Sequence, residues 1–323
     1  MSEVLSGAAA LITQLLHAAL MVVAAPLLVG IVRWLKARML GRRGASPLQP
    51  WRDLRKLLRK RPVLAENASA VTEVAPVVAL AATFAAAILV PSFALGMALG
   101  PAADLILVAG LLALARAALV LAGIDAGTAF GGLGAGREIT FAALAEPTLV
   151  LAALTLTIIA GGTNLDAIGT AFTDAAPTLR ISLALVLVGL LAVAIAEAGR
   201  VPVDNPATHL ELTMVHEAML LEASGRHLAL WEMGAALRLL VWFGLLATIF
   251  APFGMAPAGA GPVPWAVGLA AWAAKMGVLA LALAVVETAI AKMRVFRVPE
   301  FLGAALLLGL LAAVLLFVST GFA

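Results

Sequence analysis

Neither cysteine nor tyrosine occurs among the 323 residues of this chain. The lack of cysteine excludes disulfides, thiolate metal sites and cysteine-ligated iron–sulfur clusters. Any redox centre that works with the protein must therefore be held by another polypeptide. The lack of tyrosine means that no tyrosine can relay protons.

Charged residues are also scarce. They make up 12% of the chain, about half the ~25% that is usual in a soluble domain. Hydrophobic residues make up 63%, and the mean hydropathy is +1.10. Only residues 33–61 form a polar segment longer than about 25 residues. The composition predicts an all-α integral membrane protein with a single membrane domain, 1–323, and no sizeable soluble domain.

Two apparent signals are weak. The first apolar run lacks a basic region ahead of it and an A-x-A cleavage site, so we expect a retained membrane span and not a signal peptide. The glycine-rich run 131–136 does not match G-x-G-x-x-G and follows no soluble strand, so a flexible turn is favoured over a nucleotide site. The net charge of +3 comes largely from one segment, and nucleic acid is not an expected partner.

A membrane-spanning helix needs about 20 apolar residues. The sequence predicts eight such spans, because lipid-exposed backbone must satisfy its own hydrogen bonds and no alternating barrel strands occur. The spans are Val4–Val32, Val71–Phe93, Ala102–Ile124, Phe141–Gly161, Leu179–Ala196, Leu228–Phe250, Pro264–Ile290 and Phe301–Phe322.

The distribution of Lys and Arg predicts the orientation. Eleven of the 21 basic residues lie in 33–61, which is therefore expected to be cytoplasmic. The opposite loops, 92–101, 162–178 and 251–263, contain no Lys or Arg. Both termini are then expected outside the cell membrane, which is the inner membrane in a cell that has two. Within the basic loop, residues 50–61 alternate apolar and basic side chains at helical spacing, which predicts a surface helix that anchors to anionic lipid or docks a partner.

Segment 197–225 is the most informative part of the sequence. It holds five of the 18 carboxylates and two of the four histidines, between two predicted spans. Ionisable groups near membrane depth are costly and mark ion paths or coupling sites, although a solvated loop is the simpler alternative. We interpret 197–227 as a charged cytoplasmic coupling segment.

If residues 210–224 form one helix, the spacing of its histidines does not favour a metal site. His209 and His216 are seven residues apart, which is not the i, i+4 spacing of a helical zinc pair. A group that exchanges protons is favoured, because histidine titrates near neutral pH and burial raises the pKa of a carboxyl. No pair of histidines suggests haem ligation, and His17 is expected to be a packed core residue.

Most predicted spans also carry or adjoin a charge. Such groups are expected to face each other or water inside the bundle, as a proton path would require. Static ion pairs, such as Arg116 or Arg238 with a glutamate, are the alternative. The charges are Glu73, Arg116, Glu146, Glu197, Glu232, Arg238, Lys275 and Glu287.

Four stretches together resemble the subunit-one family of respiratory complex I, and within it the membrane subunits of energy-converting nickel–iron hydrogenases. The stretches are RRGASPLQPWRDLRKLL at 42–58, ENAS at 66–69, REITFAALAEP at 137–147 and VPVDNPATHLELTMVHEAM at 201–219. The quinone-reducing branch is a poorer match, because the spacing inside the acidic loop differs and its tyrosine is absent.

The resemblance implies a non-catalytic subunit of eight helices that joins a peripheral redox arm to an ion-pumping membrane arm. It implies no cofactor in this chain, with the nickel–iron centre and iron–sulfur clusters in partners. Those partners would be hydrogenase large and small subunits, an iron–sulfur subunit and antiporter-like membrane subunits. A quinone-chamber subunit and a stand-alone secondary transporter are the alternatives, although no paired broken helices of a transporter are evident.

These arguments yield two sets of candidate residues. The groups expected to couple redox events to proton movement are Glu73, Glu138, Glu146, Glu197, Asp204, Glu211, Glu217 and Glu222. The groups expected at a partner interface are Arg42, Arg43, Arg200, Asp204 and His209.

Overall fold

The computed structural model describes residues 2–174, 181–204 and 214–321. Those ranges contain eleven α-helices, two short 3-10 helices and no strand. The α-helices are α1 (Ser2–Met39), α2 (Gln49–Leu58), α3 (Ala70–Leu89), α4 (Leu105–Asp125), α5 (Ala129–Ala160), α6 (Leu165–Asp174), α7 (Ile181–Glu197), α8 (His216–Leu220), α9 (Gly225–Phe250), α10 (Pro262–Ala289) and α11 (Val298–Gly321). The prediction of an all-helical fold is confirmed.

Seven helices in the described ranges are long and apolar enough to cross a membrane: α1, α3, α4, α5, α9, α10 and α11. The remaining predicted span, Leu179–Ala196, corresponds to α7, which is apolar but has 17 residues in its described part. The helices therefore follow the order predicted from hydropathy. They identify a multi-pass membrane protein.

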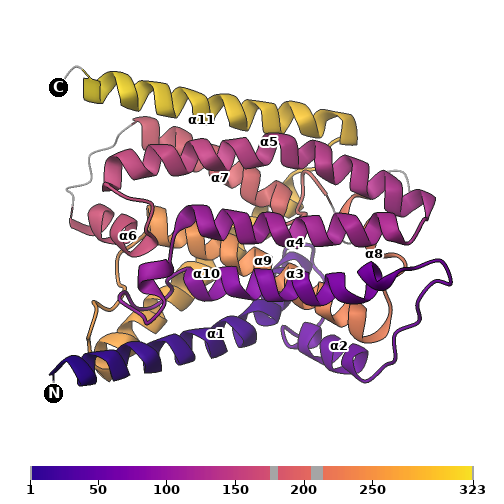
Figure 1. Ribbon diagram of the computed structural model, residues 1–323, viewed down its shortest axis with the longest axis horizontal. Helices are drawn as coiled ribbons and strands as arrows, with labels where there is room; N and C mark the ends of the chain where they lie inside the picture. The colour runs from indigo at the N-terminus through magenta and orange to yellow at the C-terminus, as the bar shows by residue number, and fades with distance from the viewer. Residues whose placement is uncertain (1, 175–180, 205–213, 322–323) are drawn as a thin grey trace.

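Helix α9 forms the centre of the bundle. It contacts α1, α2, α3, α6, α7 and α10, and 83% of its most apolar window is buried. A helix that is apolar all round suits either a protein core or contact with lipid, and the high burial of α9 places it in the core. Helix α11 lies along one flank against α5 and α7, while α1 lies along the opposite flank (Figure 1).

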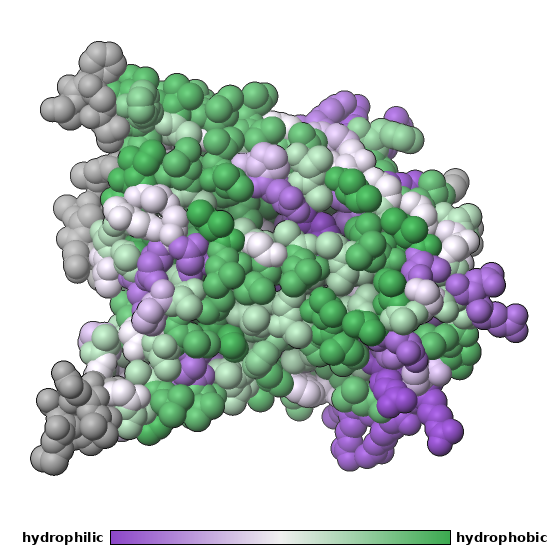
Figure 2. Space-filling view, in the orientation of Figure 1, coloured by the Kyte–Doolittle hydropathy of each residue, from purple (hydrophilic) through white to green (hydrophobic). Residues whose placement is uncertain are grey.

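The two ends of the bundle differ in character. The first turns of α1 and the last turns of α11 lie at one end, and α2 and α8 lie at the other (Figure 1). Hydrophilic residues gather around α2 and its flanking loops, whereas apolar residues cover most of the flank (Figure 2). This arrangement fits a basic loop on one side of the membrane and both termini on the other. Which of the two sides is cytoplasmic stays a prediction.

The predicted surface helix exists as α2, with Leu54 buried and basic residues on its outer side. Trp51 donates a hydrogen bond from its indole nitrogen to the Val23 carbonyl of α1, at 3.2 Å. The docking of α2 against α1 and α9 therefore holds part of the basic loop on the bundle.

The glycine-rich run is a correction. The expected flexible turn at 131–136 is instead the start of α5, which begins at Ala129. A Cβ on Gly131 would lie 2.2 Å from the Gly123 carbonyl oxygen, and one on Gly134 would lie 2.8 Å from the Val215 carbonyl oxygen. These glycines let α5 approach α4 and the segment before α8, as small residues do between membrane helices.

The helix assumed for 210–224 is also wrong in part. Within the described part of this range, 214–224, only His216–Leu220 is helical, and residues 221 and 222 form a turn. Residues 205–213, with His209 and Glu211, lie outside the described ranges. The short α8 packs against α4 and α5, and these tertiary contacts take the place of the stability that a longer helix would have.

Candidate functional site

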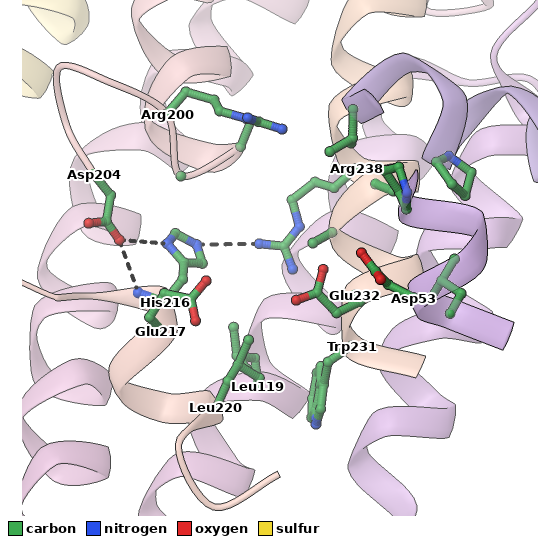
Figure 3. A pocket seen from close by; sticks show the side chains of 18 of the residues that line it. Asp53, Leu119, Arg200, Asp204, His216, Glu217, Leu220, Trp231, Glu232 and Arg238 are labelled. Atoms are coloured by element: carbon green, nitrogen blue, oxygen red, sulfur yellow. Dashed lines mark hydrogen bonds and ion pairs between the residues drawn. The ribbon is translucent and has the colours of Figure 1, made fainter. Parts of the chain in front are cut away.

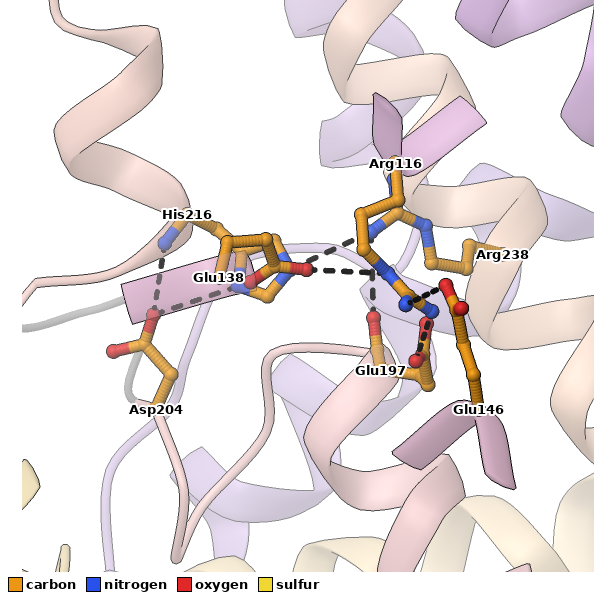
Figure 4. Close-up of polar contacts among 7 residues, drawn as sticks. All are labelled: Arg116, Glu138, Glu146, Glu197, Asp204, His216 and Arg238. Atoms are coloured by element: carbon orange, nitrogen blue, oxygen red, sulfur yellow. Dashed lines mark hydrogen bonds and ion pairs between the residues drawn. The ribbon is translucent and has the colours of Figure 1, made fainter. Parts of the chain in front are cut away.

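Three carboxylates surround one buried arginine inside the bundle. Arg116 of α4 is 6% exposed. Its Nη1 lies 2.6 Å from Glu146 Oε1, and its Nε lies 3.5 Å from Glu138 Oε1. Its Nη2 donates a hydrogen bond to Glu197 (Figure 4). Burying a single charge in an apolar medium is very costly, so each of these groups depends on the others.

Local sequence explains how the four groups meet. Arg116 lies one turn from buried Leu112 and Leu119, on the face of α4 that packs inward. Glu138 and Glu146 are eight residues apart on α5, about two turns, and so face the same side. Pro147 follows Glu146 inside α5, where proline removes one backbone hydrogen bond.

Glu197 is the last residue of α7, where the negative end of the helix dipole disfavours a carboxylate. Two arginines compensate for this position. Arg116 pairs with the Glu197 carboxylate, and Nη1 of Arg238 on α9 lies 3.4 Å from the Glu197 carbonyl oxygen, to which it donates. Arg238 is 7% exposed.

The network continues through His216, the first residue of α8. Its Nε2 lies 3.6 Å from Glu138 Oε1 and 3.5 Å from Arg238 Nη1. On its other side, the ring Nδ1 lies 3.7 Å from Asp204 Oδ2. The backbone N–H of His216 donates to the same Asp204 oxygen at 3.3 Å. Histidine therefore stands between two acidic groups (Figure 4).

Asp204 closes the chain of contacts. Its Oδ1 accepts a hydrogen bond at 2.8 Å from Nζ of Lys292, which follows α10. Residues of α4, α5, α7, α8 and α9 and the two segments with Asp204 and Lys292 thus meet in one continuous network. We call it the ion network. Its members are Arg116, Glu138, Glu146, Glu197, Asp204, His216, Arg238 and Lys292.

The net charge of the ion network depends on whether His216 is protonated. Its four carboxylates face three permanent cations, so a proton on His216 makes the cluster formally neutral. Burial alone would lower the pKa of His216, but the charge of Glu138 and the hydrogen bond to Asp204 outweigh burial and raise the pKa above 6.5. The site can therefore hold a proton near neutral pH.

The pKa of Asp204 is shifted in the opposite direction, downward. Burial opposes its ionisation, but the hydrogen bonds and positive charges of His216 and Lys292 outweigh burial and hold its pKa well below the ordinary 3.8. Asp204 thus stays a carboxylate. It anchors His216 and itself carries no proton near neutral pH.

A cavity of about 200 Å³ opens beside the ion network. His216 lines one side, and Arg238 and Glu232 of α9 line the other together with Asp53 of α2 (Figure 3). Glu217 also lines this cavity. Because α2 forms part of the wall, the cavity lies at the end of the bundle that carries the basic loop. Its wall thus brings both charged and apolar side chains next to the network.

The opposite limit of the ion network is Glu146. Its side chain is 49% exposed, whereas the Arg116 side chain that it contacts is 7% exposed. Hydrophilic atoms show in the seam between α4 and α5 on the flank of the bundle (Figure 2). The network therefore runs from the cavity to a lateral surface.

A second buried cluster lies near the first. Glu287 of α10 has a side chain that is 1% exposed, with Lys36 Nζ of α1 at 2.6 Å and Arg200 Nη1 at 3.7 Å. Burial lowers the pKa of Arg200, while Glu287 opposes that shift. Arg200 was expected at a partner surface, yet it is 8% exposed and faces Glu287. Its contact with a partner stays a prediction.

The structure groups some predicted residues and separates others. Glu138, Glu146, Glu197 and Asp204 meet in the ion network. Glu73 and Glu222 are exposed and take no part in it, and Arg42 and Arg43 lie exposed in the basic loop. His209 and Glu211 lie outside the described residues.

Sequence reasoning missed several members. The sequence does not indicate Lys292, Asp53 or Glu232 as site residues, and it indicates Arg116, Arg238 and His216 only as charged or titratable groups in or beside the spans. A signal existed for Arg116 and Arg238, because each is the single Lys or Arg of its predicted span, Ala102–Ile124 and Leu228–Phe250. None existed for Lys292, which pairs across 88 positions. In the described ranges, no group of three or more histidine, aspartate or glutamate residues is arranged to hold a metal ion.

Comparison with known proteins gives consistent results. Residues 11–318 match the family model described as NADH dehydrogenase. The chain is 34% identical over 257 residues to hydrogenase-4 component C of Escherichia coli K12, covering 79% of this chain and 80% of the relative. It is 32% identical over 240 residues to formate hydrogenlyase subunit 4 of the same organism, covering 74% and 77%.

A solved structure shares the fold. It belongs to the membrane-bound sulfane sulfur reductase, an archaeal respiratory membrane complex, and superposes with a TM-score of 0.79 at 21% identity. The match covers 94% of this chain and 99% of the other. The helices described above are thus arranged as in a subunit of a membrane complex.

Proposed function

The chain belongs to the NADH dehydrogenase family, and we propose that it is the proton-translocating coupling subunit of a hydrogenase-type redox complex. As a member it is a membrane subunit of hydrogenase-type or complex I-like respiratory complexes. The finer proposal is that it joins the redox arm to the membrane arm and passes on a change of charge. One observation carries it: the ion network is continuous from the cavity to the α4–α5 seam.

The geometry suits a relay of charge. Neighbouring members lie 2.6 to 3.7 Å apart over most of the network, so a change of protonation at one group alters the field at the next. His216 is the group whose charge changes near neutral pH. A charge change above the cavity would act first on His216, then on Glu138, and through Arg116 on Glu146.

Redox chemistry is assigned to partners in this proposal. The nickel–iron centre and iron–sulfur clusters would lie in hydrogenase large and small subunits and an iron–sulfur subunit. These would dock at the α2 end, where exposed Arg42 and Arg43 provide positive charge. Antiporter-like membrane subunits would pack along the flank.

The alternative of a quinone chamber has one observation in its favour, the cavity with both apolar and charged walls. This alternative would be supported if a quinone analogue inhibits turnover of the complex and if a substitution of Trp231, at the cavity wall, weakens that inhibition. If no quinone analogue inhibits the intact complex, the hydrogenase-type function is favoured.

The coupling proposal predicts a split phenotype. Replacing Glu138 with glutamine preserves shape but removes the charge that faces both His216 and Arg116. Hydrogen evolution from an artificial electron donor should stay near wild type, while gradient-linked turnover should fall about 100-fold or more, as when a proton-transfer group is lost. The matched control is Glu222→Gln, because Glu222 is exposed and outside the network.

Both activities would be measured in inverted membrane vesicles, with complex composition checked in the same sample. Equal gradient-linked turnover in Glu138→Gln and Glu222→Gln would show that the network is structural and would contradict the proposal.

A further inference from the structure

Helix α2 has two margins that face different surroundings. Pro50, Asp53 and Leu57 lie along one margin and line the cavity beside the ion network. Trp51 and Leu58 lie along the opposite margin, about two turns apart, and do not line that cavity. Leu58 is 57% exposed. The second margin can therefore contact a molecule outside this chain.

The second margin of α2 borders an exposed apolar face of α1. Both helices lie on the same flank of the bundle (Figure 1). The Trp51 indole N–H donates to the carbonyl of Val23, whose side chain is 56% exposed. Ile12, Leu16 and Val23 recur on one face of α1, and all three are exposed. Tryptophan is enriched where the hydrocarbon core of a membrane meets the headgroups, and the position of Trp51 at the edge of this apolar face fits that level.

Two arginines continue this margin. Arg55 and Arg59 follow Trp51 at successive intervals of four residues, so the three side chains form one row on the helix surface. Both arginines are exposed. Among the described residues, no carboxylate oxygen lies within 4.0 Å of either guanidinium group. We call Trp51, Arg55, Leu58 and Arg59 the outer margin of α2.

Contacts before and after α2 hold the outer margin in place. Before the helix, Pro47 packs so closely on α1 that a Cβ at Gly30 would overlap the Pro47 carbonyl. After the helix, the Ser224 hydroxyl accepts a hydrogen bond from the Val63 N–H at 2.8 Å and donates to the Val63 carbonyl at 3.0 Å. A surface that is already ordered loses little conformational entropy on binding. The outer margin is therefore a preformed surface.

An anionic phospholipid fits the outer margin better than a soluble protein does. A helix with tryptophan and leucine beside arginine is typical of segments that lie in the membrane interface. The apolar side chains reach the acyl-chain boundary, while arginines hydrogen-bond phosphate oxygens. Basic residues at this level also attract anionic lipid. An acidic protein surface would complement Arg55 and Arg59 but would leave Leu58 without an apolar contact.

We propose that the outer margin of α2 is a binding site for an anionic phospholipid, with Arg55 and Arg59 on the headgroup phosphate and Leu58 against the acyl chains. The proposal depends on the chain being a membrane protein and on no part of the coupling function. It leaves the other margin of α2 to the cavity, and it leaves Arg42 and Arg43 to a docked redox subunit.

The first test identifies the occupant by photo-cross-linking of the intact complex in native membranes. A photoreactive phenylalanine analogue would replace Leu58, and in a matched variant it would replace Leu57, which faces the cavity. We expect mass spectrometry to find phospholipid adducts mainly in the Leu58 variant. A protein subunit as the main adduct at Leu58, or equal phospholipid capture at the two positions, would overturn the proposal.

The second test measures the preference for a negative headgroup at the same site. The complex with the analogue at Leu58 would be reconstituted in vesicles of equal phosphatidylglycerol and phosphatidylcholine, and the ratio of the two lipid adducts would be determined. The double substitution Arg55→Gln, Arg59→Gln should lower this ratio about 25-fold, since each basic residue at a membrane surface contributes about fivefold. The charge-preserving pair Arg55→Lys, Arg59→Lys should keep most of the preference.

The matched control is the double substitution Arg42→Gln, Arg43→Gln, which removes the same charge from exposed positions before α2. The adduct ratio should stay at the wild-type value in this control. An equal fall in both double variants would show only a general attraction of the basic loop for anionic surfaces and would overturn the assignment to the outer margin. The readout is the identity of a bound lipid, so it is independent of the result with Glu138→Gln.

Discussion

The two ends of the bundle use their carboxylates in different ways. At the end with the termini, Asp104 accepts hydrogen bonds from the backbone of Ile106 and Leu107 at the start of α4, and Asp166 accepts one from Gly96. At the α2 end, Glu138 and Glu197 face Arg116. Carboxylates at the first end complete the backbone hydrogen bonding of loops and caps. At the second end the buried carboxylates interact with other ionisable groups, although Asp125 there also accepts backbone hydrogen bonds, from Ser69 and Thr72.

The contrast shows how structural and functional charges can be told apart. A carboxylate that caps a helix satisfies N–H groups that would otherwise lack partners, and its neighbours do not change charge. A carboxylate between an arginine and a histidine belongs to a cluster whose total charge depends on pH. Burial alone does not distinguish these two kinds of carboxylate. Asp166 accepts a backbone hydrogen bond and belongs to the first kind, yet it is partly buried, and burial raises its pKa.

The largest expected effect would come from breaking the centre of the ion network. Arg116→Met leaves Glu138, Glu146 and Glu197 without their shared cation. Removing one partner of a buried ion pair costs about 3–5 kcal/mol, and we expect a loss of this size in the free energy of unfolding. The measurement is thermal unfolding of the detergent-solubilised complex, with Arg116→Lys as the charge-preserving control. An unaltered midpoint in Arg116→Met would mean that the three acids are already neutral.

A smaller loss is expected at the opposite end. Asp104→Ala removes the cap of α4 and the acceptor for the Thr163 hydroxyl. Loss of an N-cap costs about 0.5–2 kcal/mol. Gradient-linked turnover per assembled complex should remain at wild-type level, which is the point of contrast with Glu138→Gln. A coupling defect in a stable Asp104→Ala complex would remove the distinction between the two ends.

The contribution of His216 should depend on pH. Its pKa is raised in the folded state, so its stabilising effect is fully present below the ordinary value of 6.5 and is lost as pH rises through the raised value. The stability difference between wild type and His216→Asn should therefore shrink with rising pH, by about 1.4 kcal/mol for each unit of pKa elevation.

Unfolding midpoints of both proteins at several pH values from 6 upward would measure this effect. His227→Asn is the control, because His227 is absent from the ion network. A difference that grows with pH would reverse the assignment.

The last prediction concerns which end faces the cytoplasm and has no energetic component. Since the chain lacks cysteine, a single introduced cysteine reports its own location. Ser46→Cys, in the basic loop, should resist an impermeant thiol reagent in intact cells, and Ala258→Cys should react. Both positions are exposed, and Ala258 avoids the positive φ of 73° at the adjacent Gly259. Labelling of Ser46→Cys would reverse the orientation.

Much of the fold could be predicted from local patterns. Hydropathy located most spans within a few residues, but α5 begins at Ala129, twelve residues before the predicted Phe141, and α1 continues to Met39, seven residues beyond the predicted Val32. The amphipathic pattern in residues 50–61 predicted α2. Both signals depend on residues close in sequence, so they survive without tertiary information. The glycine run was misread for the same reason. Its glycines serve a contact with Gly123 and Val215, and no local pattern records which helix will approach.

The sequence by itself determined that this is a helical membrane protein, that its basic residues gather in one loop, and that acids cluster in segment 197–225. Only the tertiary structure decided which charges meet. Arg116 is 81 positions from Glu197, and Asp204 is 88 positions from Lys292. Hydropathy and charge bias act along a helix, whereas pairing depends on which helix faces are turned toward each other, and that is set by packing in three dimensions.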